Sequence, residues 1–598
     1  MSNTASTFIG RVRSVTGSKI AIQLDDKVHK SSMPIVDGIL YRIGQIGSFV
    51  KIPLGYTQLF GVVTQAGADA VPDALRQVLI KNDNSQVSIG NRWISVVLVG
   101  EGISNRFDRG VAQYPTSDDE VHLVTIGDLQ IIYGGFDQEN VITVGQVSAS
   151  ESLPAQLDLN KMLTRHCAIL GSTGSGKSNT VSVILEAISS RTKLKSERII
   201  VIDPHGEYND SLTNYCKVYK IRADINKQQS ELYIPYWALP FDELLSIFSG
   251  RLNDVQKDYV RQELVKKKIY SAKKLKNPPN LNTITSDSPV PFSLKQLWFD
   301  LDDFERQTHS DNGRSIKTAL IQVGNADKYL SNIYTPASPG GGQPFLNNKA
   351  QSILSFLDSI KNKTLDERFK FLFKPGEYEP SSDGSIVKDL DQLLIDWIGH
   401  DKPITVLDLS GMPPEIMVSV SGALLKIIYD SIFWGQNLNV GGRKQPLLFV
   451  LEEAHNYLKA GDNSIASRTV QTIAKEGRKY GAGLLLITQR PSELNETVLS
   501  QCGSVISLRM TNGKDRSHVS SAIQDDLQDL INLLPSLRTG EGLVMGEMVK
   551  IPSRVKFSLI GKAPSSSDPK VIKEWQKERP KPEEYQKLVD LWRNGKFN

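Results

Sequence analysis

The sequence predicts an α/β protein of several domains, in which an N-terminal all-β unit precedes a core of parallel strands and helices. Three features predict this class. Short β-type runs fill residues 8 to about 150, a strand, helix, strand order begins at about 151, and apolar strands return after about 400 behind a long helical stretch. The 598 residues are 39% hydrophobic and 23% charged, a composition that excludes collagen, rod-like coiled coils and bulk disorder.

The N-terminal unit, assigned to residues 1–150, is predicted to be a small β-barrel or sandwich. Its apolar runs are short and are punctuated by Gly, Asn and Asp, which is typical of consecutive short strands and not of βαβ units. The predicted strands are FIGRVRSV, KIAIQLD, GSFVKIPL, QLFGVVTQAG, RWISVVLVG, EVHLVTI and LQIIYG.

Residues 151–240 predict the first part of the α/β core. TRHCAILG and ERIIVIDPHGEY are predicted strands. The segment between them has apolar residues at helical spacing, namely Val181, Ile184, Leu185 and Ile188. Two strands joined through a helix indicate parallel pairing.

A mainly helical insertion is expected over residues 241–400, with loops at 277–291 and 338–344, where Pro, Gly, Ser and Asn gather. The core resumes over residues 401–550. Its predicted strands are ITVLDLS (404–410), PLLFVLEE (446–453), GLLLITQ (483–489) and VISLRM (505–510). Residues 551–598 begin with a short β-type piece and end in a charged arm of 34 residues.

Cysteine use and the absence of an apolar leader favour a cytoplasmic protein. Cys167, Cys216 and Cys502 are too few and too far apart for a disulfide framework or a CxxC zinc site. The N-terminus, MSNTASTFIGRVRS, has no basic segment followed by an apolar one. The longest apolar run near a motif, Leu447 to Leu451, is far short of the ~20 residues that cross a bilayer, so no membrane association is expected.

The strongest motif is GSTGSGKS, a complete phosphate-binding loop of the pattern GxxxxGK[ST]. It leaves an apolar strand and enters an amphipathic helix. Glycines free backbone N–H groups to wrap phosphates, and the helix N-terminus adds positive potential. Lys177 is expected to reach the β- and γ-phosphates and the Ser178 hydroxyl to ligate Mg²⁺. The alternative is a glycine-rich turn with an exposed lysine. The predicted nucleotide-binding residues here are Gly171, Ser172, Thr173, Gly174, Ser175, Gly176, Lys177, Ser178 and Asn179.

The second motif is LLFVLEEAH, in which an apolar run ends in Glu452 and Glu453. Both carboxylates are expected at the C-terminal tip of a buried parallel strand, where open α/β sheets place their ligand. One carboxylate can hold Mg²⁺ through water, and the next can polarise the attacking water. By position, Glu452 is assigned to the metal and Glu453 to the water. In the alternative, the charges only solvate the strand end.

Two further positions have both a functional and a structural interpretation. Gln489 is the first polar residue after LLLIT, so its amide can contact both a γ-phosphate and the attacking water, or it can simply tie down the loop. In IAKEGRKYG, Arg478 precedes Gly481 as cations do at an ordinary helix C-terminus. Taken alone, Arg478 therefore has a structural explanation.

Five motifs in this order, behind an N-terminal β-domain, resemble those of the HerA family of hexameric DNA-translocating ATPases, relatives of FtsK. They are GSTGSGKSN, IIVIDPHGEY, VLEEAHNYL, EGRKYG and LLLITQRPSEL. The resemblance covers residues 8 to about 560. It implies a RecA-like P-loop ATPase core of the additional-strand type, an N-terminal HAS-barrel, a helical insertion and a C-terminal brace, within 551–598, that reaches a neighbouring subunit.

The resemblance also implies roles that spacing alone leaves open. Arg478 takes the family's arginine-finger position and acts on the γ-phosphate held by a neighbouring subunit. Arg165, twelve residues before the loop lysine, matches a family basic position near the nucleotide, and Asp203, His205 and Glu207 line the same interface. The predicted catalytic set is Lys177, Glu453, Arg478 and Gln489, with Ser178 and Glu452 for the metal.

The distribution of charge shapes the expected contact with DNA. Residues 551–598 hold 11 Lys/Arg and 6 Asp/Glu, a net +5, so the rest of the chain carries −1 of the total of +4. The body is therefore not a basic DNA-wrapping surface, but a ring needs only a basic pore, because six copies of a cationic loop can hold a phosphate backbone. A lysine-rich run, Lys266 to Lys276, could contribute, although a solvated helix face is the simpler interpretation.

The leading interpretation is an ATP-driven DNA motor, a homohexamer that binds ATP and Mg²⁺ at each subunit interface and pulls DNA through the ring pore. Archaeal members of the family pair with the nuclease NurA, and bacterial relatives occur in antiphage systems beside nuclease-like or sirtuin-like NADase effectors. This chain has no nuclease or NADase motif, so any effector is expected to be another polypeptide.

The rival interpretation is an ATP-switched hexameric platform that organises and regulates an effector without processive translocation. An ABC or SMC-type ATPase is disfavoured, because the sequence has no LSGGQ-like signature and no long heptad segment.

Overall fold

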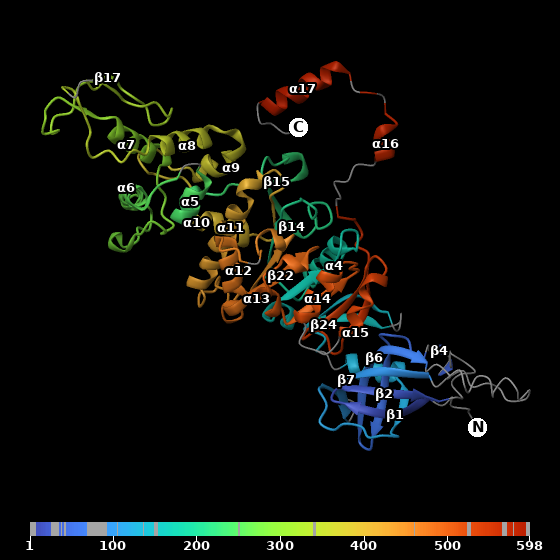
Figure 1. Cartoon of the computed structure of the whole chain (residues 1–598). Helices are drawn as coiled ribbons and strands as arrows, with labels where there is room; N and C mark the ends of the chain where they lie inside the picture. Colours follow the sequence, from blue (N-terminus) through green and yellow to red (C-terminus); the bar gives the residue numbers. More distant parts are fainter. Residues whose placement is uncertain are drawn as a thin grey trace, which may run out of the picture.

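The structure is a computed structural model of the whole chain, with a β-barrel at one end of the body, helices of the insertion at the other and a large sheet between them (Figure 1). It describes residues 7–25, 35–36, 39–40, 43–68, 92–103, 106–134, 137–148, 153–248, 251–338, 342–459, 461–522, 528–564, 571–577, 579 and 581–593. The first six residues, part of the predicted 338–344 loop and part of the charged arm lie outside these ranges. The arm leaves the body and carries α16 (Val571–Trp575) and α17 (Pro582–Arg593).

A closed six-stranded antiparallel barrel forms between residues 8 and 123, which confirms the predicted β-barrel. Its strands pair in the order β2-β1-β9-β5-β6-β7, and β2 also pairs with β7, so the sheet closes on itself. Alternate residues face the interior, where aliphatic side chains such as Ile22, Ile52 and Val96 are buried. The strands are β1 (Phe8–Thr16), β2 (Lys19–Leu24), β5 (Phe49–Leu54), β6 (Thr57–Ala68), β7 (Arg92–Ile103) and β9 (Glu120–Leu123); β8 (Arg106–Arg109) pairs with β7, and β3 (Ile35–Val36) pairs with β4 (Ile39–Leu40).

The barrel is shorter than the predicted unit of residues 1–150. LQIIYG, predicted as a strand, lies in the helix α2 (Ile126–Gly134). Thr125 and Asp128 cap its start reciprocally, with the Thr125 N–H 2.8 Å from Asp128 Oδ2 and the Asp128 N–H 3.3 Å from Thr125 Oγ1. A short apolar run cannot by itself distinguish a strand from a buried helix. β10 (Val141–Val147) and β11 (Pro154–Asp158) pair outside the barrel, with the large sheet.

The large sheet has twelve strands in the order β11-β10-β25-β24-β23-β12-β22-β21-β13-β20-β14-β15. The eight strands from β23 to β15 run parallel, and the other four extend the sheet antiparallel. Their bounds are β12 (Cys167–Leu170), β13 (Arg198–Asp203), β14 (Cys216–Lys220), β15 (Gln229–Glu231), β20 (Ile404–Asp408), β21 (Leu447–Leu451), β22 (Ala482–Thr488), β23 (Ser504–Leu508), β24 (Glu541–Gly546) and β25 (Ser553–Phe557).

β22 lies between β12 and β21, so the α/β core has the additional strand that the resemblance implies. Every residue of β12, β13, β21 and β22 is buried, as expected for parallel strands covered on both faces. We call the edge where the parallel strands end the carboxyl edge, and the opposite edge the amino edge.

Helices pack on both faces of this sheet. α4 (Lys177–Ser189) buries Val181, Ile184, Leu185 and Ile188, as their spacing predicts. By length and composition, α11 (Pro414–Trp434) could cross a membrane, but more than half of its apolar window is buried inside the fold, against α5 and α12. The remaining helices of the core are α3 (Leu159–Thr164), α12 (Ile465–Glu476), α13 (Glu496–Ser500), α14 (Gly513–Ala522) and α15 (Gln528–Ile531).

Most of the regular structure between β15 and β20 is helical, with two small antiparallel pairs, β16 (Thr308–His309) with β19 (Phe345–Leu346) and β17 (Leu320–Gln322) with β18 (Ile333–Tyr334). Its helices are α5 (Phe241–Ile247), α6 (Asp254–Ala272), α7 (Leu294–Arg306), α8 (Leu354–Leu365), α9 (Lys370–Phe373) and α10 (Leu390–Ile398).

Most of the lysine-rich run of α6 and the turn after it is engaged within the insertion. Lys266 pairs with Glu263, Lys267 with Asp300 and Lys274 with Asp383. Lys268 is 1% exposed and donates to the carbonyls of Ser286 and Ser288. These contacts favour the structural interpretation of this run.

Candidate nucleotide-binding site

The phosphate loop, residues 171–176, connects β12 with α4 at the carboxyl edge. Gly174 and Gly176 have φ values of 71° and 100°, in the left-handed region that side chains disfavour. A Cβ on Gly171 would lie 2.6 Å from Ser175 Oγ. Gly176 is the N-cap of α4 and supplies no side-chain cap, so the helix N-terminus is open to an anion. The backbone of the loop is therefore shaped to bind phosphate.

Lys177 lies over this loop. Its Nζ donates to the carbonyl oxygens of Gly171 and Ser172, at 3.1 and 3.2 Å. Burial lowers the pKa of Lys177 from its usual value, and the nearby carboxylates, Glu453 first among them, partly offset this effect. A phosphate oxygen that replaced the two carbonyls would meet the same amine.

Gln489 follows β22 directly and lies at the phosphate loop. Its Oε1 accepts a hydrogen bond of 2.5 Å from Thr173 Oγ1. Gln489 therefore holds the phosphate loop through Thr173, as the structural interpretation predicts, and its amide lies beside the loop that would hold a phosphate.

Glu452 and Glu453, at the end of β21, have different environments. Glu452 is 5% exposed; its Oε1 accepts from the Tyr208 hydroxyl, and its Oε2 accepts from the N–H of Glu453 at 3.2 Å. Burial raises the pKa of Glu452 to about 8, so this carboxyl holds a proton at pH 7.

Glu453 has a φ of 47°, a strained backbone conformation for a residue with a side chain. Its Oε2 lies 3.2 Å from Nδ1 of His455, and that nitrogen is 3.0 Å from Thr488 Oγ1. Burial alone would raise the pKa of Glu453, but His455, Lys177 and His205 outweigh it, and the pKa lies below its ordinary value. Adjacent carboxyls with opposite shifts can take different roles, one neutral and one ionised.

The DPHGEY turn after β13 brings Glu207 to the phosphate loop, where the Ser178 hydroxyl donates to Glu207 Oε2. The prediction that Asp203 lines an interface is wrong, because this residue is fully buried and holds the turn together. Its carboxylate accepts the N–H groups of His205, Gly206 and Tyr208. Burial and the neighbouring Asp408 raise the pKa of Asp203 to about 7.

The two predicted arginines lie on the amino edge, away from the loop. Arg478 is exposed in the 3-10 turn η8 (Gly477–Tyr480), just before β22, whose seven residues separate it from Gln489 by about 20 Å. Arg165 precedes β12, and its Nε pairs with Glu547 at 3.3 Å. The length of β12, about 13 Å, separates Arg165 from the phosphate loop of the same chain.

The amino edge nevertheless brings the two arginines into one region, since α3 packs against η8. His166 fixes this region, because its Nδ1 accepts the Leu484 N–H at 3.1 Å and its ring bonds to the Ala474 backbone. Both arginines therefore lie at the end of the sheet opposite the phosphate loop of their own chain.

The side chain of Asn179, a residue predicted to bind nucleotide, anchors the C-terminal segment. Its Nδ2 donates to the Ser558 carbonyl at 2.8 Å, and its Oδ1 accepts the Ile560 N–H at 3.1 Å.

Arg509 and Thr539 were not predicted, yet both donate to the Gly174 carbonyl at 3.3 Å. Arg509 ends an apolar strand, as Gln489 does, and that shared feature of the sequence could have identified it.

Oxygen donors suitable for Mg²⁺ occur at the loop, where the Ser178 hydroxyl meets the Glu207 carboxylate. Within the described ranges, no cluster of three or more His, Cys, Asp or Glu side chains could hold a metal by itself. The residues present therefore fit Mg²⁺ that arrives with phosphate oxygens and keeps several waters, as this ion commonly does.

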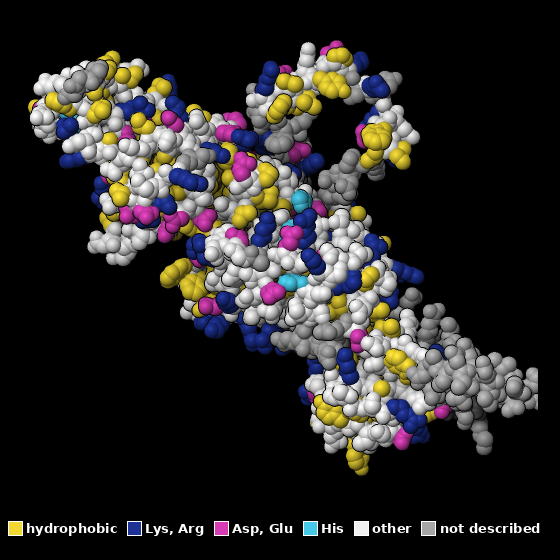
Figure 2. Space-filling model, viewed as in Figure 1, with side chains coloured by type: hydrophobic (Ala, Val, Ile, Leu, Met, Phe, Trp, Pro, Cys, Tyr) yellow, Lys and Arg dark blue, Asp and Glu magenta, His cyan; other side chains and the backbone are white. Residues whose placement is uncertain are grey.

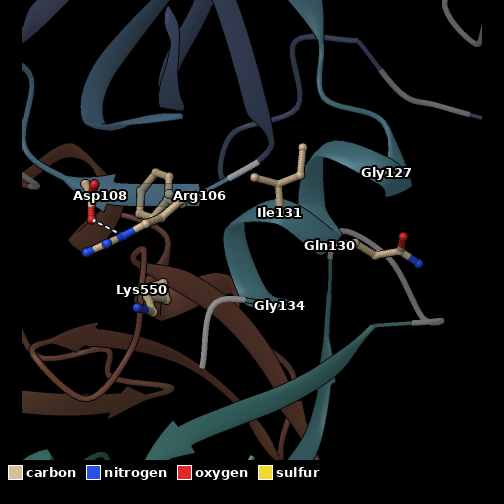
Figure 3. Close-up of a pocket in the computed structure, with 8 residues that line it drawn as sticks. Arg106, Asp108, Gly127, Gln130, Ile131, Gly134 and Lys550 are labelled. Carbon is tan, nitrogen blue, oxygen red and sulfur yellow. Dashed lines mark hydrogen bonds and ion pairs between the residues drawn. The ribbon is translucent and has the colours of Figure 1, made fainter. Parts of the chain in front are cut away.

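A cleft of about 550 Å³ lies elsewhere, between β8, α2 and the loop after β24 (Figure 3). Arg106, Gln130 and Lys550 are among its lining residues, and Arg106 pairs with Asp108 at 3.2 Å. None of the predicted site residues lines it.

Two family profiles match the chain. The profile described as "Helicase HerA, central domain" matches residues 142–428, and "Helicase HerA-like C-terminal" matches residues 421–590. The DNA double-strand break repair helicase HerA of Saccharolobus solfataricus is 27% identical over 447 residues, which are 74% of this chain and 73% of that protein. The protein of the same name from Sulfurisphaera tokodaii is 26% identical over 550 residues, 91% of this chain and 94% of that protein. Among solved structures, VirB4 of Thermoanaerobacter pseudethanolicus aligns with a TM-score of 0.44 at 14% identity, over 71% of this chain and 98% of that one.

Proposed function

Because this chain belongs to the HerA helicase family, we propose that it is an ATPase that uses hydrolysis to move along DNA. The observation that carries the proposal is the meeting of three elements at the carboxyl edge: the phosphate loop, the ionised Glu453 and Gln489, which is 2.5 Å from Thr173. The relatives named as DNA repair helicases supply the DNA part of the proposal.

In the proposed reaction, Lys177 exchanges its two carbonyl partners for phosphate oxygens and offsets their charge. Glu453 takes the proton of the attacking water as the bond between the γ-phosphorus and ADP breaks, and phosphate leaves. His455 holds that carboxylate in place from 3.2 Å. The Gln489 amide orients the water. Mg²⁺, when bound beside the Ser178 hydroxyl, neutralises charge on the β- and γ-phosphates.

The proposed assembly is a homohexamer in which the amino edge of one subunit meets the carboxyl edge of the next. Arg478 is exposed, and its side chain has no hydrogen-bond or ion-pair partner among the residues that the structure describes. Three apolar side chains between the end of α11 and the start of β21, at the same edge, are also exposed: Trp434 by 82%, Leu438 by 62% and Val440 by 66%. Figure 2 shows Lys and Arg side chains gathered on the flank below α12 and α13. Exposed apolar side chains beside an unpaired cation suit an interface between copies.

A roadblock experiment tests translocation. The wild-type protein should hydrolyse ATP faster with DNA and displace streptavidin from biotin-labelled DNA, and Lys177→Ala should do neither. DNA-stimulated hydrolysis without displacement would favour the rival, an ATP-switched platform.

The proposed biological setting is DNA processing or antiphage defence in the cytoplasm, with a separate nuclease or NADase as effector. Six barrels on one face of a ring would present a symmetric docking surface, on which weak contacts add through multivalency. Tyr56, fully exposed in the turn between β5 and β6, is a suitable probe of that surface. If the barrel docks the effector, Tyr56→Ala should weaken co-purification and leave ATP turnover unchanged; unchanged co-purification would favour the ATPase face or the arm.

A further inference from the structure

The Ser178 hydroxyl, beside the phosphate loop, meets a carboxylate from the turn after β13, that of Glu207, and not one from the end of β21. Ser178 is the second residue of α4, and its hydroxyl is the one that ligates Mg²⁺ in P-loop proteins. That hydroxyl donates to Glu207 Oε2. Two oxygen ligands of one ion must lie close together, so this contact marks Glu207 as a candidate ligand.

The backbone around Glu207 is built to hold it there. The buried Asp203 carboxylate accepts three N–H groups of the turn, from His205 at 3.2 Å, Gly206 at 2.8 Å and Tyr208 at 3.2 Å. Gly206 has a φ of 73°, and a Cβ on it would lie 2.9 Å from Asp408 Oδ2. These contacts therefore fix the backbone on both sides of Glu207.

Glu452, by contrast, is occupied. The Tyr208 hydroxyl donates to its Oε1 and the Glu453 N–H to its Oε2, and the residue is 5% exposed. To ligate an ion, Glu452 would have to lose a bond that positions either Tyr208 or Glu453. Glu207 Oε2 already accepts the Ser178 hydroxyl, so an ion or its water placed between these two oxygens would take the position of that proton.

We propose that Glu207, with Ser178, holds the Mg²⁺ of the bound nucleotide, directly or through one water, and that Glu452 is a positioning residue. The turn after β13 thereby supplies the acidic ligand that the motif at the end of β21 is expected to supply. This assignment rests on the proposed ATPase function.

Nucleotide binding by the full chain, measured without turnover, tests the assignment. A fluorescent ATP analogue is titrated at increasing Mg²⁺, and Mn²⁺ binding to the same complex is followed by electron paramagnetic resonance. Glu207→Gln should raise the Mg²⁺ concentration at half-maximal analogue binding by roughly tenfold or more and weaken the Mn²⁺ signal, since loss of a metal-site partner has effects of that size. Its affinity for the analogue without metal should be as high as in the wild type or higher, because a negative charge near the phosphates is removed.

Two further variants complete the design. Ser178→Ala should shift the Mg²⁺ dependence as Glu207→Gln does, whereas Glu452→Gln should leave it near the wild-type value. The assignment is overturned if Glu452→Gln shifts the Mg²⁺ dependence and Glu207→Gln does not, or if neither carboxylate matters. Wild-type protein that shows no metal-dependent nucleotide binding at all would overturn the proposed ATPase instead. Circular dichroism confirms that each variant is folded.

Discussion

Replacing Glu453 with glutamine should abolish turnover without preventing ATP binding. The pKa of Glu453 is held below its ordinary value, so at pH 7 the carboxylate is ionised and able to take a proton. Glutamine has nearly the same size and can still bond to His455, but it cannot accept a proton. A positioned general base typically contributes a factor of about 10²–10⁴, which is about 3–5 kcal/mol of barrier.

The carboxyl next to Glu453 in the chain is a poor substitute for this base. Glu452 is the nearest carboxyl along the chain, but its pKa of about 8 keeps it protonated at pH 7, and both of its oxygens already accept hydrogen bonds. The expected loss in Glu453→Gln is therefore the full contribution of the base. ATP binding should be as tight as in the wild type or tighter, because one negative charge near the phosphates is gone while Lys177 is intact.

Phosphate release and equilibrium binding of a fluorescent ATP analogue separate these effects. Glu452→Gln is the matched control, and its turnover should fall much less, because a neutral side chain replaces a neutral one. Turnover above about a tenth of the wild type in Glu453→Gln, equivalent to less than ~1.4 kcal/mol of barrier, would refute the role of Glu453 as base. An equal loss in the control would do the same.

Three other predictions concern the ring, the DNA and the amino edge. Mixing Lys177→Ala with Arg478→Ala subunits should restore part of the ATPase activity, because one interface then joins an intact loop to an intact finger; no recovery at any ratio in verified mixed rings would indicate a role within one subunit. DNA affinity, measured by anisotropy, should fall by about 10³-fold or more between 50 and 200 mM salt if six or more phosphates are contacted, and a flat response would contradict a phosphate-binding pore. Burial lowers the pKa of His166 to about 4, so the unfolded chain binds more protons than the folded one between about pH 6.5 and 4. Stability should therefore fall by about 1 kcal/mol per unit as the pH drops through that window; His166→Asn, which keeps an acceptor for the Leu484 N–H, should reduce this slope in denaturant titrations, and an unchanged slope would contradict the assignment.

The sequence alone determined the features that depend on local pattern. The phosphate loop follows from its glycines between an apolar strand and an amphipathic helix, and two of these glycines, Gly174 and Gly176, have positive φ values. Glu452, Glu453 and Gln489 follow apolar strands, and parallel strands deliver such residues to one edge. The barrel, too, was predictable, because alternation of apolar residues has a period of two wherever a strand has one buried face.

Only the tertiary structure decided the features that depend on partners distant in sequence. LQIIYG lies in a helix whose Tyr133 hydroxyl bonds to Ser553 Oγ at 2.6 Å, and a short apolar run has no period that shows this. Asp203, Asn179 and Glu452 are all polar residues within motifs, yet each is taken up by hydrogen bonds to the chain itself. A polar side chain becomes a ligand only if the fold leaves it without such a bond or, as at Glu207, offers one that a ligand can replace, because a buried polar group must be satisfied by one partner or another.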